Sequence, residues 1–187
     1  RIGFAERSAK MVRTAAAIPA IAALQSEYSL IARNPEIAVI EACKDHGTAW
    51  VAFSHVGRGM FSQVPLEPDQ YWEGDMRRAF FPRLAEPHFS ENMKLMPRAR
   101  EMAEDIGCTL PQLALAWVLA KGPEVVAIPG TKSIPHLEDN WGAMTVTLTD
   151  DQVAILDAHF TPEAISGARY SSAGQDSVTT EMFDFER

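Results

Sequence analysis

Apolar and polar positions follow two patterns along this chain, and the two patterns alternate. Short apolar runs predict buried strands, and between them apolar residues recur at the three- and four-residue spacing of amphipathic helices. The predicted strands, with their polar exits, fall in 1–4, 21–30, 48–59 and 124–129. The predicted helices are 6–18, 33–47, 91–107, 109–122, 133–144 and 149–160.

Three helices begin with a recognisable capping signal. Ser8 precedes the first helix and is expected to cap it. Thr109 with Gln112, and Thr149 with Gln152, have the spacing of the capping box, in which side chain and backbone satisfy each other.

Proline and asparagine mark two further helices. Asn34 is expected to cap helix 33–47, with Pro35 at its first position and Gly47 ending it. Pro97 should kink helix 91–107, because proline lacks the amide hydrogen that the helix needs. The predicted apolar face of helix 33–47 comprises Ile37, Ile40 and Ala42.

Alternating strands and helices indicate an α/β fold with parallel pairing. A doubly wound sheet would carry a glycine fingerprint before a helix. The sequence "GRGMFS" at 57–62 lacks the third glycine and runs into a proline-rich segment. Part of a (β/α)8 barrel fits better, because polar residues cluster where strands end, and phosphate often binds after the last two strands of such barrels. The long segment 63–90 is expected to be functional.

The stretch "VVAIPGTKSIPHLEDN" at 125–140 passes directly from an apolar strand to a helix start. A helix N-terminus offers free backbone amides and a positive dipole end, and so predicts an anion site. These features alone allow any phosphate or carboxylate.

Composition narrows the class of protein. The chain is 47% hydrophobic, as ordinary globular proteins are, and its net charge of −8 argues against a nucleic-acid partner. The longest apolar helix is too short to span a bilayer, and Cys43 and Cys108 are expected to be free thiols. We therefore expect a cytoplasmic protein without membrane contact. The five histidines lack metal-ligand spacing, so no metal site is predicted.

The two ends of the chain differ in character. The sequence begins "RIGFAERSAK", without Met and inside a predicted strand, whereas residues 165–187 are polar. We therefore expect a fragment that lacks its front part, with 165–187 as a C-terminal tail.

Three motifs in order, "IAALQSEYSL", "VAFSHVGRG" and "VVAIPGTKSIPHLEDNWGA", closely resemble the aldo-keto reductases. The resemblance implies a (β/α)8 TIM barrel of which residues 1–187 form the C-terminal half, about strands 5–8. It also implies an NAD(P)H-dependent oxidoreductase that reduces aldehydes or ketones by hydride transfer, with NADP(H) favoured over NAD(H).

The resemblance assigns cofactor roles residue by residue. Gln25 would bind the nicotinamide carboxamide and Phe53 would stack on the ring. The turn along the pyrophosphate would comprise Ser54, Val56, Gly57 and Arg58. The adenosine 2′-phosphate would meet Gly130, Thr131, Lys132 and His136, and the adenine would meet Asp139 and Asn140.

Several family positions differ or are absent. Ala5 stands where relatives have Ser or Asn, and His136 stands where an Arg often reaches the phosphate. Because histidine is mostly neutral at pH 7, its grip on a phosphate is weaker than that of arginine. The family's catalytic Asp, Tyr, Lys and His have no counterpart here, so no catalytic residue is assigned.

Two alternatives stay open. The chain could be a nucleotide-binding or structural module without catalysis, or a different barrel enzyme with a phosphate site on its last strands. Half a barrel would expose strand edges and one apolar face, so we expect that an N-terminal half or another copy covers them, or that the fold is rearranged.

Overall fold

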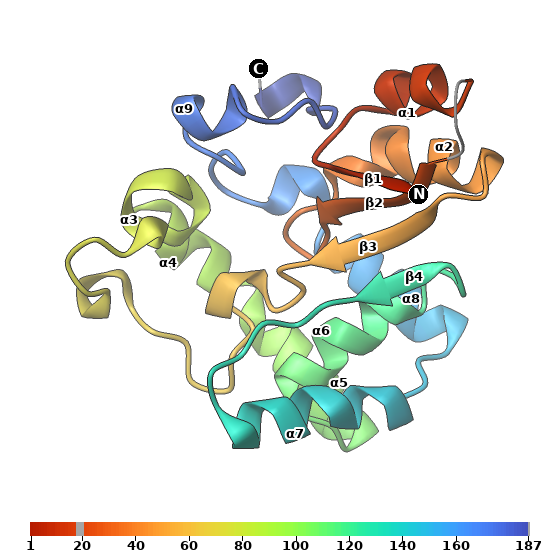
Figure 1. Ribbon diagram of the computed structural model, residues 1–187. Coiled ribbons are helices and arrows are strands. Elements are labelled where there is room, and N and C mark those ends of the chain that lie inside the picture. Colours follow the sequence, from red (N-terminus) through yellow and green to blue (C-terminus); the bar gives the residue numbers. More distant parts are fainter. Residues whose placement is uncertain (18–20, 187) are drawn as a thin grey trace.

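The computed structural model describes residues 1–17 and 21–186. Strands form one layer with helices packed behind it (Figure 1). The strands are β1 (Ile2–Ala5), β2 (Ile21–Glu27), β3 (Ala49–Phe53) and β4 (Val125–Ala127). The helices are α1 (Ala9–Ala16), α2 (Val39–Asp45), α3 (Met76–Phe80), α4 (His88–Met93), α5 (Met96–Ile106), α6 (Leu110–Leu119), α7 (Ile134–Gly142), α8 (Asp150–His159) and α9 (Ser172–Gln175).

Within the described residues the strands form one four-stranded sheet in the order β1-β2-β3-β4. All three pairings are parallel, and each connection crosses over through helical segments. This confirms the predicted α/β fold and its strands. The expected end of the first helix, Ile18, lies outside the described residues.

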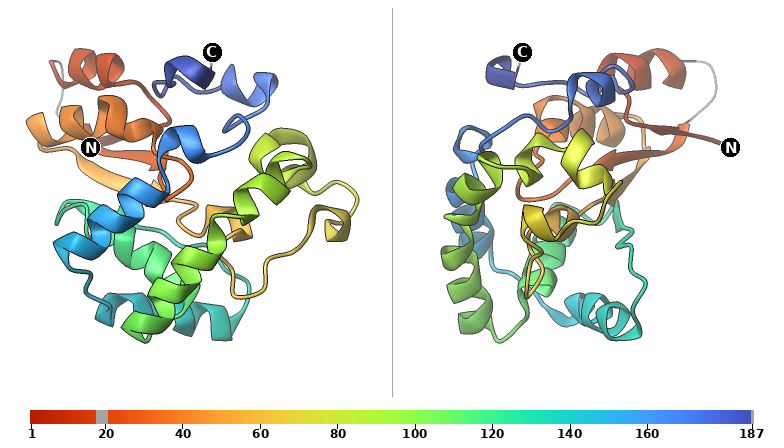
Figure 2. Two further views of the ribbon diagram at one scale, coloured as in Figure 1. Left: turned by 180° about the vertical axis from the view of Figure 1, so that it is seen from behind. Right: turned by 90° about the vertical axis from the view of Figure 1, so that its left-hand side faces the viewer.

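One face of the sheet packs on helices. Leu24, Trp50 and Val125 are neighbours across β2, β3 and β4, and Leu24 and Trp50 are buried in the main core. From behind, α5 and α8 lie in front of the strands (Figure 2, left). The helical layer therefore supplies the apolar cover that buried parallel strands require.

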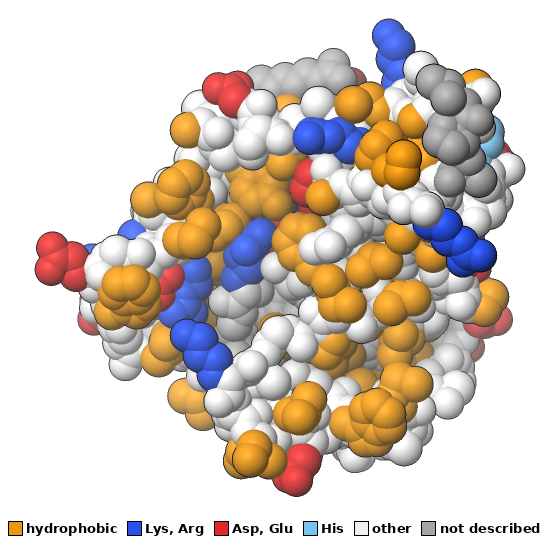
Figure 3. Space-filling view, in the orientation of Figure 1, with side chains coloured by type: hydrophobic (Ala, Val, Ile, Leu, Met, Phe, Trp, Pro, Cys, Tyr) orange, Lys and Arg blue, Asp and Glu red, His pale blue; other side chains and the backbone are white. Residues whose placement is uncertain are grey.

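The other face of the sheet is open. Gln25, Val51 and Val126 are neighbours on this face; Gln25 is exposed, and Val126 is 48% exposed. On α7, Ile134 and Trp141 are 72% and 74% exposed. Figure 3 shows this side of the molecule, with apolar side chains gathered over the strands. Neighbouring apolar groups exposed in this way are typical of a surface that packs against protein.

The capping predictions for three helices are confirmed. Ser8 accepts a hydrogen bond from the Met11 amide at the start of α1. Thr109 and Thr149 each form a complete capping box with the glutamine three residues later, at α6 and α8. These signals are local, and the structure preserves them.

The predicted cap at Asn34 is wrong. Residues Asn34–Ile37 form a short 3-10 helix, and Ala38, whose backbone is not helical, separates it from α2. The Asn34 side chain is buried and donates hydrogen bonds to Glu181 O and to Glu186 Oε2. The buried face of α2 therefore comprises Val39, Ala42 and Cys43, while Ile37 is 41% exposed.

The segment around Pro97 forms two helices rather than one kinked helix. α4 ends at Met93, and α5 begins at Met96 with Pro97 in its first turn, where a missing amide hydrogen does no harm. The long segment 63–90 contains α3 and the start of α4.

The C-terminal segment from Ile165 to Glu186 returns across the ends of β1 and β2. The Thr179 amide donates to Glu6 O, and the Ala9 amide donates to Glu181 Oε1 at the start of α1. Cys43 and Cys108 are free, as expected. No helix in residues 1–17 and 21–186 is long and apolar enough to cross a membrane.

Candidate functional site

The exit of β3 is a tight turn with several residues in left-handed conformation. The φ angles of Ser54, Gly57 and Arg58 are 59°, 55° and 54°. A Cβ on Gly57 would lie 2.9 Å from Ile31 Cδ1, so only glycine fits there without displacing a neighbour. Successive left-handed and right-handed residues turn backbone N–H groups toward one side, which is how backbone concavities bind anions.

Some amides of this turn are free to bind a ligand. The Gly57 amide donates to Ser54 O at 2.9 Å, and the Gly59 amide donates to Val56 O at 3.0 Å. In the described part of the chain, no acceptor receives the amides of Val56 and Arg58. The turn is therefore stabilised by its own backbone hydrogen bonds, and the amides of Val56 and Arg58 remain available as donors to a ligand.

A cleft of about 550 Å³ joins this turn to the exit of β4 and the first turns of α7. Nine of the twelve residues assigned to the cofactor line it, and Gln25, Gly57 and Lys132 do not. The nine are Phe53, Ser54, Val56, Arg58, Gly130, Thr131, His136, Asp139 and Asn140. The exits of two neighbouring strands thus meet in one cavity, as parallel strand ends do.

Gln25 lies beside this cleft on the open face of the sheet. Its Cα partner on β3 is Val51, and Phe53 follows Val51 by two residues. Because residues two apart in a strand point to the same face, Gln25 and Phe53 share a face. Gln25 is exposed there and could reach a ligand that extends from the cleft.

The β4 exit presents a helix start with a positive charge beside it. Thr131 Oγ1 accepts a hydrogen bond from the Ser133 amide at 3.1 Å, just before α7. Lys132 is exposed next to it, and no described acid forms an ion pair with it. His136 is exposed one turn later. The positive end of the α7 helix dipole and the Lys132 charge both favour binding of an anion.

Asp139 has a structural contact in addition to its place in the cleft. Its Oδ1 accepts hydrogen bonds from Thr109 Oγ1 at 2.9 Å and from Gln112 Nε2 at 3.0 Å. This leaves Oδ2 as the carboxylate oxygen that could accept a hydrogen bond from a ligand in the cleft. Asn140 is half-buried beside it in the cleft.

The Arg58 side chain is already engaged. Its Nε and Nη2 donate to the two carboxylate oxygens of Glu27 at 3.0 and 3.1 Å, and its guanidinium carbon lies 3.6 Å from the centroid of the Phe81 ring. Arg58 lines the cleft, but much of its side-chain charge is neutralised by Glu27.

The sequence analysis did not predict that Glu27 and Phe81 are partners of Arg58. Glu27 lies only two residues after Gln25, at the strand end, and that position was an available signal. Phe81 lies within the aromatic stretch of the long loop, where no spacing singles it out.

Two titratable groups near the turn are shifted by burial. Burial lowers the pKa of His55 to about 4, so this histidine, whose Nε2 lies 2.7 Å from Ala52 O, is neutral at pH 7. Burial raises the pKa of Tyr170, the opposite of what activating a tyrosine as a proton donor requires. Within the described residues no group of three or more His, Cys, Asp or Glu could hold a metal.

Solved structures share the fold. The glycerol dehydrogenase AKR11B4 from Gluconobacter oxydans superposes with a TM-score of 0.75 at 21% identity, covering 86% of this chain and 49% of that one. An aldo-keto reductase from Klebsiella pneumoniae, solved with NADPH, gives a TM-score of 0.64 at 24% identity, covering 87% and 48%. Together they confirm the prediction that this chain corresponds to half of a (β/α)8 barrel.

Sequence comparison gives nearer relatives. The aldo-keto reductase yakc [NADP(+)] of Schizosaccharomyces pombe is 38% identical over 172 residues, or 90% of this chain and 50% of the relative. The aldo-keto reductase str7 of Strobilurus tenacellus is 37% identical over 176 residues, or 92% and 52%. The chain thus spans about half the length of these curated relatives. Since the model of the Aldo/keto reductase family also matches residues 1–160, the chain belongs to the aldo-keto reductase family.

Proposed function

We propose that this chain is the cofactor-binding part of an NAD(P)H-dependent oxidoreductase that reduces aldehydes or ketones by hydride transfer. The observation that carries the proposal is the single cleft in which nine assigned residues converge from the exits of β3 and β4 and from α7. The nicotinamide supplies the hydride when it is bound, and the protein binds and orients it.

The groups around the cleft fit a dinucleotide. Free amides of the β3 turn suit a pyrophosphate, and the start of α7 with Thr131 and Lys132 suits the phosphate at the adenosine end. Gln25 would hold the carboxamide and Phe53 would stack on the nicotinamide ring, since both lie on the open face. Asp139 Oδ2 and Asn140 would meet the adenine.

NADP(H) is favoured over NAD(H) for two reasons. Lys132 is exposed at the β4 exit and suits the additional phosphate of NADP(H). One relative bears NADP(+) in its name, and one solved neighbour holds NADPH. His136 would reduce this preference compared with an arginine, because an imidazole cannot form the two parallel hydrogen bonds that a guanidinium forms with a phosphate.

No residue of this chain is assigned as the proton donor. The acid would come from an N-terminal half of the barrel, which would also cover the open face of the sheet; another copy of the chain could cover that face instead. The second candidate function, a nucleotide-binding module without catalysis, is favoured because burial raises the pKa of each tyrosine in the described residues, Tyr28, Tyr71 and Tyr170.

Titration of the protein with NADPH, followed by the fluorescence of the nicotinamide, tests the binding proposal. Saturable binding supports it, and no binding up to millimolar cofactor contradicts it. An assay of NADPH oxidation with a small aldehyde separates the two functions: turnover supports the reductase, and binding without turnover supports the module.

A further inference from the structure

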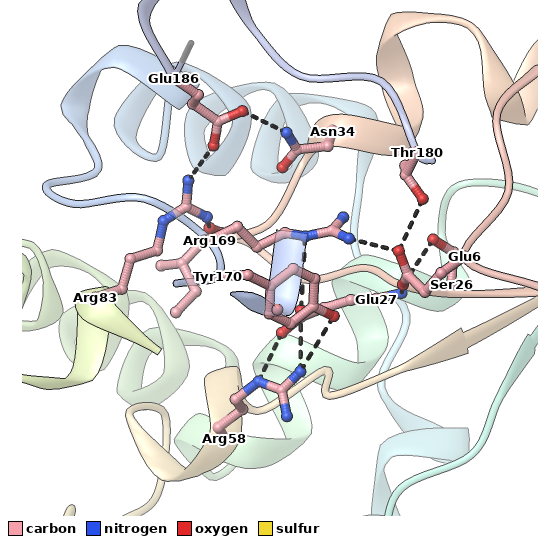
Figure 4. A network of polar contacts seen from close by, with 12 residues as sticks. Glu6, Ser26, Glu27, Asn34, Arg58, Arg83, Arg169, Tyr170, Thr180 and Glu186 are labelled. Carbon is pink, nitrogen blue, oxygen red and sulfur yellow. Dashed lines mark hydrogen bonds and ion pairs between the residues drawn. The ribbon is translucent and has the colours of Figure 1, made fainter. Parts of the chain in front are cut away.

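A buried polar network joins the C-terminal segment to the ends of β1, β2 and β3 (Figure 4). Glu6 follows β1, Glu27 ends β2, and Arg58 lies in the turn after β3. Arg169 and Tyr170 reach these residues from the C-terminal segment. The network therefore connects the proposed pyrophosphate turn to residues more than a hundred positions away.

Glu6 is the first centre of the network. Its Oε1 accepts hydrogen bonds from Ser26 Oγ at 3.0 Å and from the Glu27 amide at 2.6 Å. Its Oε2 accepts one from Thr180 Oγ1 at 2.7 Å and one from Arg169 Nη2. Glu6 thereby fixes the backbone at Glu27 and is itself held by the C-terminal segment.

Arg169 balances the charges of two buried acids. Its side chain is 4% exposed, and besides Glu6 it faces Glu27, with Nε 3.9 Å from Oε2. Removing one partner from a buried set of charges leaves the others uncompensated. Glu27 therefore faces two cations, with Arg58 at 3.0 Å and Arg169 further away on the side of the C-terminal segment.

Tyr170 lies between the two arginines. The Arg169 guanidinium carbon is 4.4 Å from the centroid of the Tyr170 ring, and Arg58 Nη2 donates to the Tyr170 hydroxyl at 3.5 Å. Phe81 packs on Tyr170 with ring centroids 5.6 Å apart, and Arg58 lies over Phe81. The Arg58 side chain is thus held by an acid and by two aromatic rings.

This anchoring matters because Arg58 has an unfavourable backbone conformation. A φ of 54° is strained for a residue with a Cβ, and such a residue persists there only when its surroundings hold it. The same backbone conformation directs the free amide of Arg58 in the proposed pyrophosphate turn. Loss of the anchor should therefore change the shape of the turn.

We propose that Arg169 and Tyr170 are positioning residues, which hold Arg58 through Glu27 and Phe81 and so keep the β3 turn in its cofactor-binding conformation. The expected effect on cofactor affinity rests on the proposed function. The C-terminal segment would act on the cofactor without touching it.

A double-mutant cycle tests this proposal. Tyr170→Leu should weaken NADPH binding about tenfold, the size of a typical coupling between residues in contact, and Tyr170→Phe should weaken it far less because the ring remains. Arg58→Gly removes the need for an anchor, because glycine adopts positive φ freely. In the Arg58→Gly background Tyr170→Leu should therefore have little further effect, and an equal loss in both backgrounds overturns the proposal.

Hydrogen exchange of the peptide 54–62 gives a readout that does not need the cofactor. Tyr170→Leu and Arg169→Met should speed exchange in this peptide, and Arg98→Met, which removes an exposed arginine of α5, should not. If the parent protein fails to bind NADPH, the proposed function fails while exchange still tests the anchor. Unchanged exchange in the Tyr170→Leu variant overturns the anchor itself.

Discussion

The hydroxyl of Thr109 donates a 2.9 Å hydrogen bond to Asp139 Oδ1, and so joins the first residue before α6 to the middle of α7. Gln112 donates to the same oxygen and to the Asp139 carbonyl, each at 3.0 Å. Both partners also form the capping box of α6. The helix start that the sequence specifies locally therefore also orients α7, which forms one wall of the cleft.

Asp139→Ala is expected to lower the free energy of unfolding by about 1–3 kcal/mol, because the half-buried Thr109 hydroxyl and Gln112 amide lose a charged acceptor. Urea denaturation measures the change. Glu138→Ala, which removes a neighbouring exposed acid on the same helix, is the control and should change stability little. Equal effects of the two substitutions would contradict a structural role for Asp139.

Two buried tryptophans allow a second comparison. Trp117 is 0% exposed and donates to Asp157 Oδ1 at 2.8 Å, whereas the indole nitrogen of Trp50, which is 1% exposed, has no partner in the described structure. Both substitutions by phenylalanine remove similar volume, but only Trp117→Phe breaks a bond to a carboxylate. We expect Trp117→Phe to destabilise the protein by about 1.5–3 kcal/mol more than Trp50→Phe. Denaturation of both variants in parallel checks this. A larger loss of stability for Trp50→Phe would show that ring packing contributes more than the hydrogen bond.

Features fixed within a few residues could be predicted from the sequence. The capping boxes at Thr109 and Thr149 need only a partner three residues later, and the strands needed only their apolar runs. Asn34 followed by Pro35 is also a local signal for a helix start, yet the Asn34 side-chain amide donates to Glu181 and Glu186, which lie 147 and 152 residues further along the chain. No local pattern reveals that such distant groups bind the Asn34 side chain in place of the helix amides.

The candidate site divides in the same way. Parallel strands place the exits of β3 and β4 together, so the convergence of Phe53, Thr131 and Asn140 followed from strand order and the family resemblance. The engagement of Arg58 by Glu27, Phe81 and Tyr170 needs three segments that meet only in the folded chain. Sequence reasoning therefore placed Arg58 in the turn after β3, but it could not predict which partners its guanidinium contacts.

Stability should depend on pH through His55. Burial lowers its pKa to about 4 from an ordinary value near 6.5, so between these values the unfolded chain binds a proton that the folded protein does not. Stability therefore falls as pH decreases from about 6.5 to about 4. From pH 7 to pH 5 this histidine should remove about 2 kcal/mol.

Variants of two histidines isolate this contribution. Urea denaturation at both pH values should show a smaller pH-dependent loss for His55→Gln than for the parent protein. His46→Gln changes an exposed histidine and should keep the full loss. If His55→Gln keeps it as well, other groups cause the acid sensitivity.

Lys132 should contribute to the choice between the two nicotinamide cofactors. It lies exposed beside Thr131 at the β4 exit, where the 2′-phosphate is proposed to bind, so its charge is partly screened by solvent. Lys132→Ala should weaken NADPH binding about fivefold, as expected for an exposed ionic contact, and leave NADH binding nearly unchanged. Lys10→Ala, which removes an exposed lysine of α1, should change neither affinity. Conversely, His136→Arg should strengthen NADPH binding, because a guanidinium binds phosphate with two parallel hydrogen bonds. Fluorescence titration of each variant with both cofactors measures these effects. Equal losses for NADPH and NADH on Lys132→Ala would mean that the lysine acts on a group common to both cofactors, and the 2′-phosphate would then have to bind elsewhere.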